Sequence, residues 1–341
     1  MKNYLKIVHI DEYSSTPKYR QLVNAIMQGI ESGQIVKDDQ LPSINDFCVA
    51  LDLSRNSVEK TYNTLKKAGI VTSVAGKGFF IAQDQFEQPV KTLLLFNKLS
   101  GHKKIVYDAF VDALGNSAAV DFYVYNNDFN IFKKLISEKV NSYAKFVIVP
   151  HFLENSDRAY EMINTIPREK LILLDKLVKG VTGNFSSIYQ DFENDIYSAL
   201  EQLLEQLCKY HTLKIIFPQD SYHSKEILKG FKRFCRQYAF DYDMITYVKD
   251  EVINQGTGYI TLTEDDLVEL IEMMINSGLT AGVDVGLISY NETPIKRVIL
   301  NGITTISTNF EMMGKMAAEE VLNPSCQHIA VPFKVTLRKS L

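Results

Sequence analysis

Apolar residues recur at helical spacing in three consecutive segments near the start of the chain. These are residues 19–30, residues 43–51, which begin with the spacing of a capping box, and residues 54–67, where an apolar stripe follows a polar cluster. Two β-prone runs around Gly76-Lys77-Gly78 then predict a hairpin. A helix, a helix–turn–helix pair and a hairpin in this order are the layout of a winged helix, whose third helix enters the DNA major groove.

Beyond residue 92 the pattern changes to short apolar runs that alternate with amphipathic helices such as residues 103–114 and 225–238. The runs are typical of buried parallel strands; they are residues 92–96, 119–125, 145–150, 170–175, 214–217, 258–262 and 283–289. This alternation predicts an α/β fold with parallel sheets covered on both faces. Because the segment is longer than one such sheet needs, we expect two lobes with a cleft between them.

The stretch between the two patterns, residues 83–92, has no periodicity and contains Pro89. We therefore expect three parts: residues 1–82 as a winged helix-turn-helix domain, a linker, and residues 93–341 as a two-lobed ligand-binding domain. Charge agrees with this division. The whole chain has a net charge of −4, but residues 1–82 carry +2 and the remainder −6. A mildly basic front on an acidic body suits a local anion-binding surface and excludes a chain that binds polyanions along its whole length.

Composition limits the remaining classes. With 341 residues, 46% of them hydrophobic and 23% charged, the chain is that of a globular protein with large cores. The four cysteines are scattered without a CxxC pair, which indicates reduced thiols. The N-terminus lacks the apolar core of a secretory signal, and no apolar run is long enough to span a bilayer. We expect a cytoplasmic protein without a membrane partner.

The first 82 residues resemble the GntR family of bacterial transcription factors. The family's "LPS" helix start, "SRxTV" recognition helix, "YxxL" stripe and "GxG" wing have counterparts at residues 41–43, 54–58, 62–65 and 76–78. The resemblance and the polar cluster together indicate a DNA-binding surface, which consists of Ser43, Asn45, Ser54, Arg55, Asn56, Ser57, Lys60, Gly76 and Lys77.

Within this surface the residue types suggest separate roles. Arg55 suits guanine or phosphate, and Asn56 can pair with adenine. Ser54 and Ser57 suit phosphate and the helix cap. Lys60 and Lys77 suit the DNA backbone, although a solvated helix face is an equal alternative for Lys60. Two positions depart from the family: Asn45 replaces its usual arginine, and Glu59 stands where a basic residue is frequent. Weaker binding or an unusual operator would follow.

The second half, residues 91–341, resembles the sugar-binding domain of LacI/GalR-type repressors, which share the fold of periplasmic binding proteins. The agreement is strongest at residues 281–294, where that family has a strand ending in a polar turn, and at residues 303–322, its Thr-Thr strand and Met-Gly helix. The ending at residues 335–341 is also similar. Some GntR proteins that govern carbohydrate use, such as the arabinose-responsive members, carry such a second half.

A sugar cleft requires polar side chains at the carboxyl ends of strands and an aromatic face. The resemblance and the strand ends indicate eight candidates: Asn127, Asp128, Asp175, Lys225, Glu264, Asp265, Asn291 and Phe310. The arginine that many family members place before a Gly-aromatic turn is missing, since Ile227 has that spacing. The sequence has no tryptophan, so stacking must come from Phe or Tyr. His151, His211 and His223 are too dispersed along the chain to predict a metal site, and no cofactor is expected.

These features favour a non-enzymatic sensor-regulator: a homodimer that binds a near-palindromic operator and responds to a small carbohydrate. The alternative is a GntR head fused to a pyridoxal-phosphate aminotransferase-like domain, but no lysine and carboxylate are placed convincingly for that cofactor. A transport binding protein would need a signal peptide and no DNA head. Activation or repression depends on the operator's position and is left open.

Overall fold

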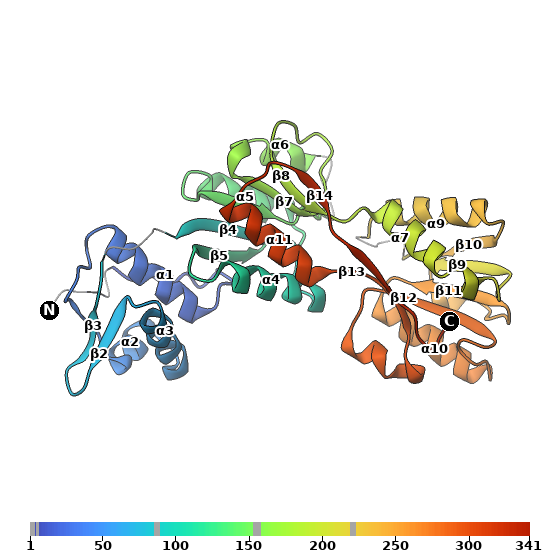
Figure 1. The fold of residues 1–341 in the computed structure, drawn as a ribbon, viewed down its shortest axis with the longest axis horizontal. Coiled ribbons are helices and arrows are strands. Elements are labelled where there is room, and N and C mark those ends of the chain that lie inside the picture. The colour runs from blue at the N-terminus through green and yellow to red at the C-terminus, as the bar shows by residue number, and fades with distance from the viewer. Residues whose placement is uncertain (1–3, 5–6, 85–88, 153–157, 219–222) are drawn as a thin grey trace.

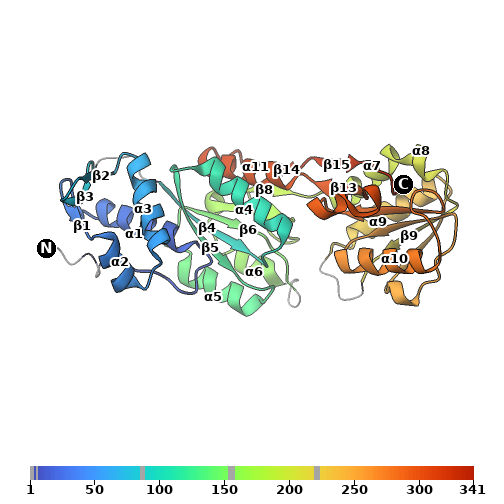
Figure 2. The same cartoon turned by 90° about the horizontal axis from the view of Figure 1, so that it is seen from below.

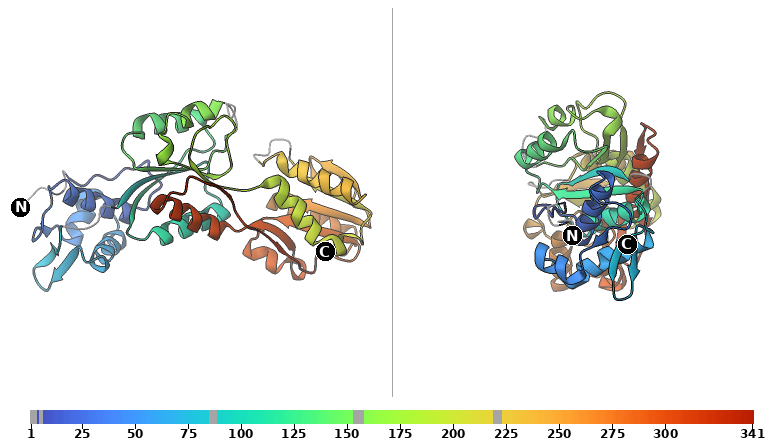
Figure 3. Two further views of the ribbon diagram at one scale, coloured as in Figure 1. Left: turned by 45° about the horizontal axis from the view of Figure 1, so that its top comes forward. Right: turned by 90° about the vertical axis from the view of Figure 1, so that its left-hand side faces the viewer.

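The computed structural model describes residue 4 and residues 7–84, 89–152, 158–218 and 223–341. The chain forms an elongated molecule in which a small head is followed by two α/β lobes (Figures 1 and 2). Viewed along the long axis, the head lies in front of the lobes (Figure 3). The expected fold class, a winged helix followed by a two-lobed α/β body, is confirmed.

The head consists of three helices and a three-stranded sheet of order β1-β3-β2. Its elements are α1 (Lys18–Glu31), β1 (Gln40–Leu41), α2 (Ile44–Leu51), α3 (Arg55–Lys67), β2 (Val71–Val74) and β3 (Gly78–Ile81). Ser43 and Asp46 form the expected capping box at the start of α2. Tyr62 on α3 stacks on Phe79 of β3 with 3.8 Å between ring centroids, and this contact fastens the hairpin to the helix.

Lobe 1 is a six-stranded sheet of order β14-β8-β7-β6-β4-β5 in which all strands are parallel. Its strands are β4 (Val90–Phe96), β5 (Ala118–Val124), β6 (Lys145–Ile148), β7 (Leu171–Asp175), β8 (Ser186–Tyr189) and β14 (His328–Ala330). One face packs on α4 (Gly101–Leu114) and α11 (Phe310–Leu322), and the other on α5 (Phe129–Lys139) and α6 (Ala159–Ile163). A 3-10 turn at Arg168–Lys170 leads into β7.

Lobe 2 is a second six-stranded sheet, of order β10-β9-β11-β12-β13-β15, parallel except for its last strand. Its strands are β9 (Thr212–Ile216), β10 (Asp241–Ile245), β11 (Thr257–Thr261), β12 (Val285–Tyr290), β13 (Thr304–Thr308) and β15 (Phe333–Thr336). The helices are α7 (Phe192–Gln202), α8 (Leu204–Leu207), α9 (Glu226–Gln237) and α10 (Glu264–Asn276), with 3-10 turns at Val248–Asp250, Pro294–Arg297 and Ile299–Asn301. Helices α7 and α9 cover one face and α10 the other.

The chain passes between the lobes three times: from β8 to α7, from β13 to α11, and from β14 to β15 (Figure 1). Hydrogen bonds join these crossings, because the amide of Val331 donates to the carbonyl of Tyr189 at 2.8 Å and that of Asn309 to Pro332 at 3.0 Å. Two of the crossings leave from the carboxyl end of a strand, β8 in lobe 1 and β13 in lobe 2. The carboxyl ends of both sheets therefore face each other across these hydrogen-bonded connections.

The head is attached to the free edge of lobe 1. The segment before α1 runs along β5, where the amide of Ser15 donates to the carbonyl of Phe122 at 2.8 Å and the amide of Phe122 donates to Oγ1 of Thr16 at 2.6 Å. The hydroxyl of Tyr123 donates to Asp11 at 2.8 Å. Pairing the edge in this way satisfies backbone groups that an exposed edge strand would leave open. The linker expected at residues 83–92 includes residues 85–88, which lie outside the described residues, and β4 begins at Val90.

Candidate functional site

The start of α3 presents a polar surface away from the head's core. Its inner face is buried through Val58, Thr61, Tyr62 and Leu65, which fixes the direction of the opposite face. The Ser54 side chain caps the helix by accepting the amide of Ser57 at 3.2 Å. Among the expected DNA-binding residues, Ser57 is half-buried and the others are exposed: Ser43, Asn45, Ser54, Arg55, Asn56, Lys60, Gly76 and Lys77.

Both departures from the family pattern contact Arg55. Its Nε donates to Glu59 Oε1 at 2.7 Å, and a terminal guanidinium nitrogen lies 3.4 Å from Asn45 Oδ1. The Arg55 side chain is two-thirds exposed, so its ion pair with Glu59 is weak. The guanidinium can therefore leave Glu59 and bind another acceptor, such as a DNA phosphate. Lys60 takes a different direction, with its ammonium 4.0 Å from the ring centroid of Tyr19 on α1.

A second candidate site lies between the lobes, at the carboxyl ends of their strands. Three of the expected effector residues line this cavity: Asp175 at the end of β7, Asn291 after β12, and Phe310 at the start of α11. Parallel sheets bind ligands at this edge, because loops and helix N-termini converge there. The cavity is further lined by Asn97, His102, Lys103, His151, Gln190, Phe192, His223, Ser224, Ile227 and Tyr290.

Asp175 is the centre of a buried polar cluster. Its Oδ2 accepts hydrogen bonds from Lys103 Nζ and His151 Nε2, both at 2.8 Å, and its Oδ1 accepts one from the side-chain amide of Gln190. Burial by itself would raise the pKa of Asp175, but the Lys103 ammonium and the His151 hydrogen bond hold that pKa well below its usual range. Asp175 therefore remains ionised. Thr308 Oγ1 donates to Gln190 at 2.5 Å, which links the cluster to another crossing between the lobes.

Several polar atoms of the cavity wall find no hydrogen-bond partner among the described residues. They are Oδ1 of Asn97, the hydroxyl of Tyr290 and Oδ1 of Asn291. Asn97 and Tyr290 are almost fully buried. A buried polar atom that stays unpaired costs about 1–3 kcal/mol. Three such atoms around one cavity, one on lobe 1 and two on lobe 2, are therefore available to a polar ligand that supplies the missing partners.

Aromatic rings and histidines complete the wall. The ring of His102 stacks on Phe310 with 4.8 Å between centroids, and Phe192 and Tyr290 add apolar surface. Burial lowers the pKa of His102 and of His223 to about 4, and it lowers that of His151 as well, so all three imidazoles are neutral at pH 7. Neutral imidazoles both donate and accept hydrogen bonds.

The other expected effector residues do not line the cavity. Asn127 contacts a residue of the cavity wall instead, since its side-chain oxygen accepts a hydrogen bond from Asn97 Nδ2 at 2.6 Å. Asp128 caps α5 by accepting two backbone amides. Lys225, Glu264 and Asp265 are exposed; Lys225 precedes α9, and the two acids lie in the first turn of α10.

Sequence reasoning missed the histidines and Lys103. The apparent dispersion of the histidines along the chain was misleading, because His151 and His223 come together with His102 at the cavity. Asn97 and His151 each follow a strand of lobe 1, so the rule that selected Asp175 also applies to them. Within the described residues, no three His, Cys, Asp or Glu side chains are grouped to hold a metal ion. The described helices also include none with the length and apolarity of a membrane span.

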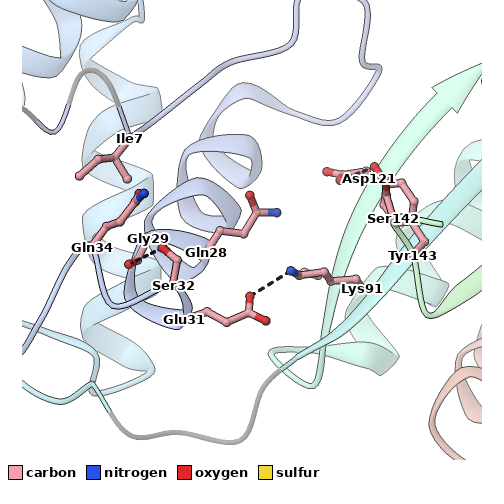
Figure 4. Close-up of a pocket in the computed structure, with 11 residues that line it drawn as sticks. Ile7, Gln28, Gly29, Glu31, Ser32, Gln34, Lys91, Asp121, Ser142 and Tyr143 are labelled. Atoms are coloured by element: carbon pink, nitrogen blue, oxygen red, sulfur yellow. Dashed lines mark hydrogen bonds and ion pairs between the residues drawn. The ribbon is translucent and has the colours of Figure 1, made fainter. Parts of the chain in front are cut away.

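A third hollow lies at the joint between head and lobe 1 (Figure 4). Its wall is formed by the end of α1 and the edge of lobe 1, and the ion pair between Glu31 and Lys91 spans it at 3.0 Å. The side chains labelled in Figure 4 are mostly polar. The hollow is wide and lacks buried unpaired atoms, so it belongs to the docking of the head and is the weaker candidate for a ligand site.

Comparisons with known proteins agree with both halves of this description. Residues 18–81 match the model of the family described as bacterial regulatory proteins, gntR family. The HTH-type transcriptional repressor YtrA of Bacillus subtilis is 28% identical over 107 residues, which cover 31% of this chain and 78% of that protein. The arabinose metabolism transcriptional repressor of Geobacillus stearothermophilus is 19% identical over 352 residues, and the match covers 90% of each chain.

Among solved structures, the lac repressor dimer bound to operator and the anti-inducer ONPF superposes with a TM-score of 0.59. The two chains are 15% identical, and the match covers 74% of this chain and 94% of the other. At this identity the likeness shows the fold of the lobes alone. That fold is the one expected for a LacI/GalR-like body and differs from the aminotransferase-like alternative.

Proposed function

We propose that this chain, which joins a GntR-family winged-helix head to a two-lobed body of the LacI/GalR fold, is a DNA-binding transcriptional regulator controlled by a small carbohydrate. The observation that carries the proposal is the presence, in one chain, of an exposed polar helix start on the head and a cavity with unpaired buried oxygens between the lobes. The polar helix start is suited to DNA, and the cavity is suited to a polyol.

The DNA-binding part rests on the start of α3. Arg55 and Asn56 are exposed there, and both can form bidentate contacts with base edges in the major groove. Ser54 and the wing residue Lys77 are placed for phosphates, which supply most of the affinity but little sequence preference. The relatives in both halves are named as repressors, which supports operator binding.

The carbohydrate part rests on the chemistry of the cavity. Each sugar hydroxyl donates one hydrogen bond, and Asn97 Oδ1 and Asn291 Oδ1 are acceptors without a donor among the described residues. The faces of Phe192 and Phe310 suit the CH groups of a sugar ring. The name of the arabinose repressor supports the same ligand class.

Control of DNA binding requires that a cavity ligand favours one arrangement of the lobes. The Asp175 cluster is suited to this, because Gln190 connects it to Thr308 on another crossing. In a homodimer on inverted half-sites, a change in the lobes would alter the spacing of the two heads. A coupling of about 1–3 kcal/mol changes operator affinity roughly 5- to 150-fold.

The experiment that tests the proposal is selection of binding sites from a pool of random duplex DNA by the full-length protein. We expect enrichment of one sequence with inverted half-sites, and no enrichment by Arg55→Ala at the same salt concentration. A matched control is Lys67→Ala, which alters an exposed lysine at the far end of the same helix. Enrichment of no sequence by the folded wild-type protein would refute the proposal.

A further inference from the structure

We propose that lobe 1 holds the DNA-binding head in a restrained position, in which helix α4 lies opposite the recognition helix α3, and that the head must leave this position to bind DNA. The inference rests on the proposed function, because it concerns the same head, and it adds a restraint within the chain. It follows from the hollows between α3 and α4, from the charges that face each other there, and from the polar joint that holds the head.

The recognition helix lies on the side of the head that is turned towards α4 (Figures 1 and 2). Three of the expected DNA-binding residues, Asn56, Ser57 and Lys60, line a hollow of about 560 Å³ whose opposite wall is α4. A second hollow, of about 230 Å³, continues between the later turns of α3 and the end of α4. Spaces of this size hold small molecules. The DNA major groove alone is about 12 Å wide and is bordered by both backbones, so a duplex that takes up α3 meets α4 in this arrangement.

Four charged side chains line the larger hollow, and their signs differ between its walls. Arg20 and Lys60 come from the head, whereas Asp108 and Asp112 come from α4. Asp108 also pairs with Lys104 at 2.5 Å, and Asp112 forms no ion pair within the described part of the chain. The opposite charges favour the docked head. The same aspartates repel the phosphates that Lys60 is suited to bind, so the docked position opposes DNA.

The joint that holds the head against lobe 1 is polar. Thr16, which is 3% exposed, accepts the amide of Phe122 on its side-chain oxygen, and the amide of Ser15 donates to the Phe122 carbonyl. On α1, the side-chain amide of Asn24 lies 3.4 Å from the carbonyl oxygen of Val120. Among the described residues, the hydrophobic core of the head includes none from the lobes. The head can therefore leave lobe 1 by breaking hydrogen bonds, without opening a hydrophobic core.

Helix α4 also connects this restraint to the effector cavity. His102 and Lys103 in its first turn line the cavity, while Asp112 near its end lines the hollow at α3. The helix has 14 residues and is therefore about 21 Å long. It packs closely on α11, because a Cβ added at Gly314 would lie 2.4 Å from the backbone oxygen of Val106. A ligand that shifts the first turn of α4 therefore also shifts its acidic face against the recognition helix.

The first test is hydrogen exchange of the full-length wild-type protein with and without a duplex of mixed sequence. At low salt, phosphate contacts are sufficient for such a duplex to bind. Docking protects the amide of Phe122, because Thr16 is its acceptor. We expect exchange in β5 around Phe122 to become faster when the duplex is saturating, while exchange in β11 of lobe 2 stays unchanged. A bound duplex that left the head docked would not speed exchange at this amide.

The second test is the affinity of the same duplex for a variant of the joint, measured by fluorescence anisotropy at fixed salt. Because docking and DNA binding exclude each other, a weaker joint gives tighter DNA binding. We expect Thr16→Val to bind about fivefold or more tightly than wild type, since it leaves the buried amide of Phe122 without its acceptor. Thr261→Val, which removes a buried threonine hydroxyl from lobe 2, should bind like wild type.

A variant of the acidic face tests the restraint without disturbing the joint. For Asp112→Asn we expect DNA binding that is about two- to fivefold tighter, the range of one exposed charge interaction. Asp243→Asn removes an equal charge from the exposed strand β10 of lobe 2 and should change the affinity less. The comparison separates the position of the charge from the net charge of the chain.

Any one of three results would overturn the inference. They are exchange at Phe122 that is unchanged or slower with DNA, a Thr16→Val variant that binds DNA no more tightly than wild type, and equal effects of Asp112→Asn and Asp243→Asn. In each case a wild-type protein that binds DNA leaves the proposed regulator intact. A folded wild type that binds neither this duplex nor a selected operator refutes both, so the two failures are distinguishable.

Discussion

Removing the charge of Asp175 is expected to destabilise lobe 1 strongly. The side chains of Lys103 and Asp175 are only 7% and 9% exposed, and their ion pair measures 2.8 Å. In Asp175→Asn the Lys103 ammonium remains buried without its counter-ion. Breaking one side of a buried pair costs about 3–5 kcal/mol. Domains of ordinary stability have about 5–15 kcal/mol in total, so the loss is large.

The expected loss can be measured by urea unfolding followed by circular dichroism, with tyrosine fluorescence as a second probe because the chain lacks tryptophan. We expect a clearly lower midpoint for Asp175→Asn. The double variant Asp175→Asn/Lys103→Met should regain a large part of the loss, because it removes the unpaired charge. Asp108→Asn, which breaks an exposed pair with Lys104, should leave the midpoint unchanged.

The opposite pattern would refute the reasoning. If Asp175→Asn unfolds at the wild-type midpoint, the carboxylate does not neutralise a buried ammonium. If the double variant is less stable than Asp175→Asn, Lys103 stabilises the lobe by something other than this ion pair.

Three other predictions concern the head, its attachment and the cavity. Glu59→Gln should tighten DNA binding by up to about fivefold in fluorescence anisotropy, because it frees Arg55 from an exposed ion pair. Thr16→Val should destabilise the attachment by about 1–3 kcal/mol and speed hydrogen exchange at Phe122, whose buried amide loses its acceptor. Acidification from pH 7 to pH 5 should lower stability by about 2 kcal/mol through His102 alone, a loss absent in His102→Gln.

The sign of the pH effect follows from the two states of His102. Its pKa is about 4 in the folded protein and near 6.5 in the unfolded chain, so the unfolded state takes up the proton first as the pH falls. Stability is therefore full above pH 6.5 and decreases towards pH 4. Equal losses in wild type and His102→Gln would contradict this assignment.

Unchanged DNA affinity in Glu59→Gln would show that the ion pair with Glu59 does not restrain Arg55. Unchanged hydrogen exchange at Phe122 in Thr16→Val would show that Thr16 is not the acceptor that protects this amide.

The elements of the fold could be predicted wherever local chemistry determines them. The stripe on α3 and the capping box at Ser43 are local patterns, and the structure confirms both. The strands β8, β10, β14 and β15 were not among the predicted apolar runs. Most residues of β10 and β14 are exposed, β8 begins with two serines, and β15 is only partly buried, so none of them has a continuous buried apolar run.

The candidate site could be predicted only in part, because its residues come from both lobes. Asp175 was found by its position at the end of an apolar strand, and Asn291 by the resemblance of its turn to the polar turn of LacI/GalR-type repressors. Glu264 occupies a motif position of the LacI/GalR family, but the structure places it, exposed, in the first turn of α10. Lys103 carries no local signal, since its burial depends on the long-range contact with Asp175, 72 residues away.

The central claim is that the cavity controls the head, and operator binding with and without the cavity ligand tests it most directly. The measurement is an anisotropy titration of the selected duplex by the full-length protein, at fixed salt, with the sugar that binds most tightly either absent or saturating. The account predicts a change in Kd of roughly 5- to 150-fold. Identical curves, from a protein that demonstrably binds both DNA and sugar, would contradict it.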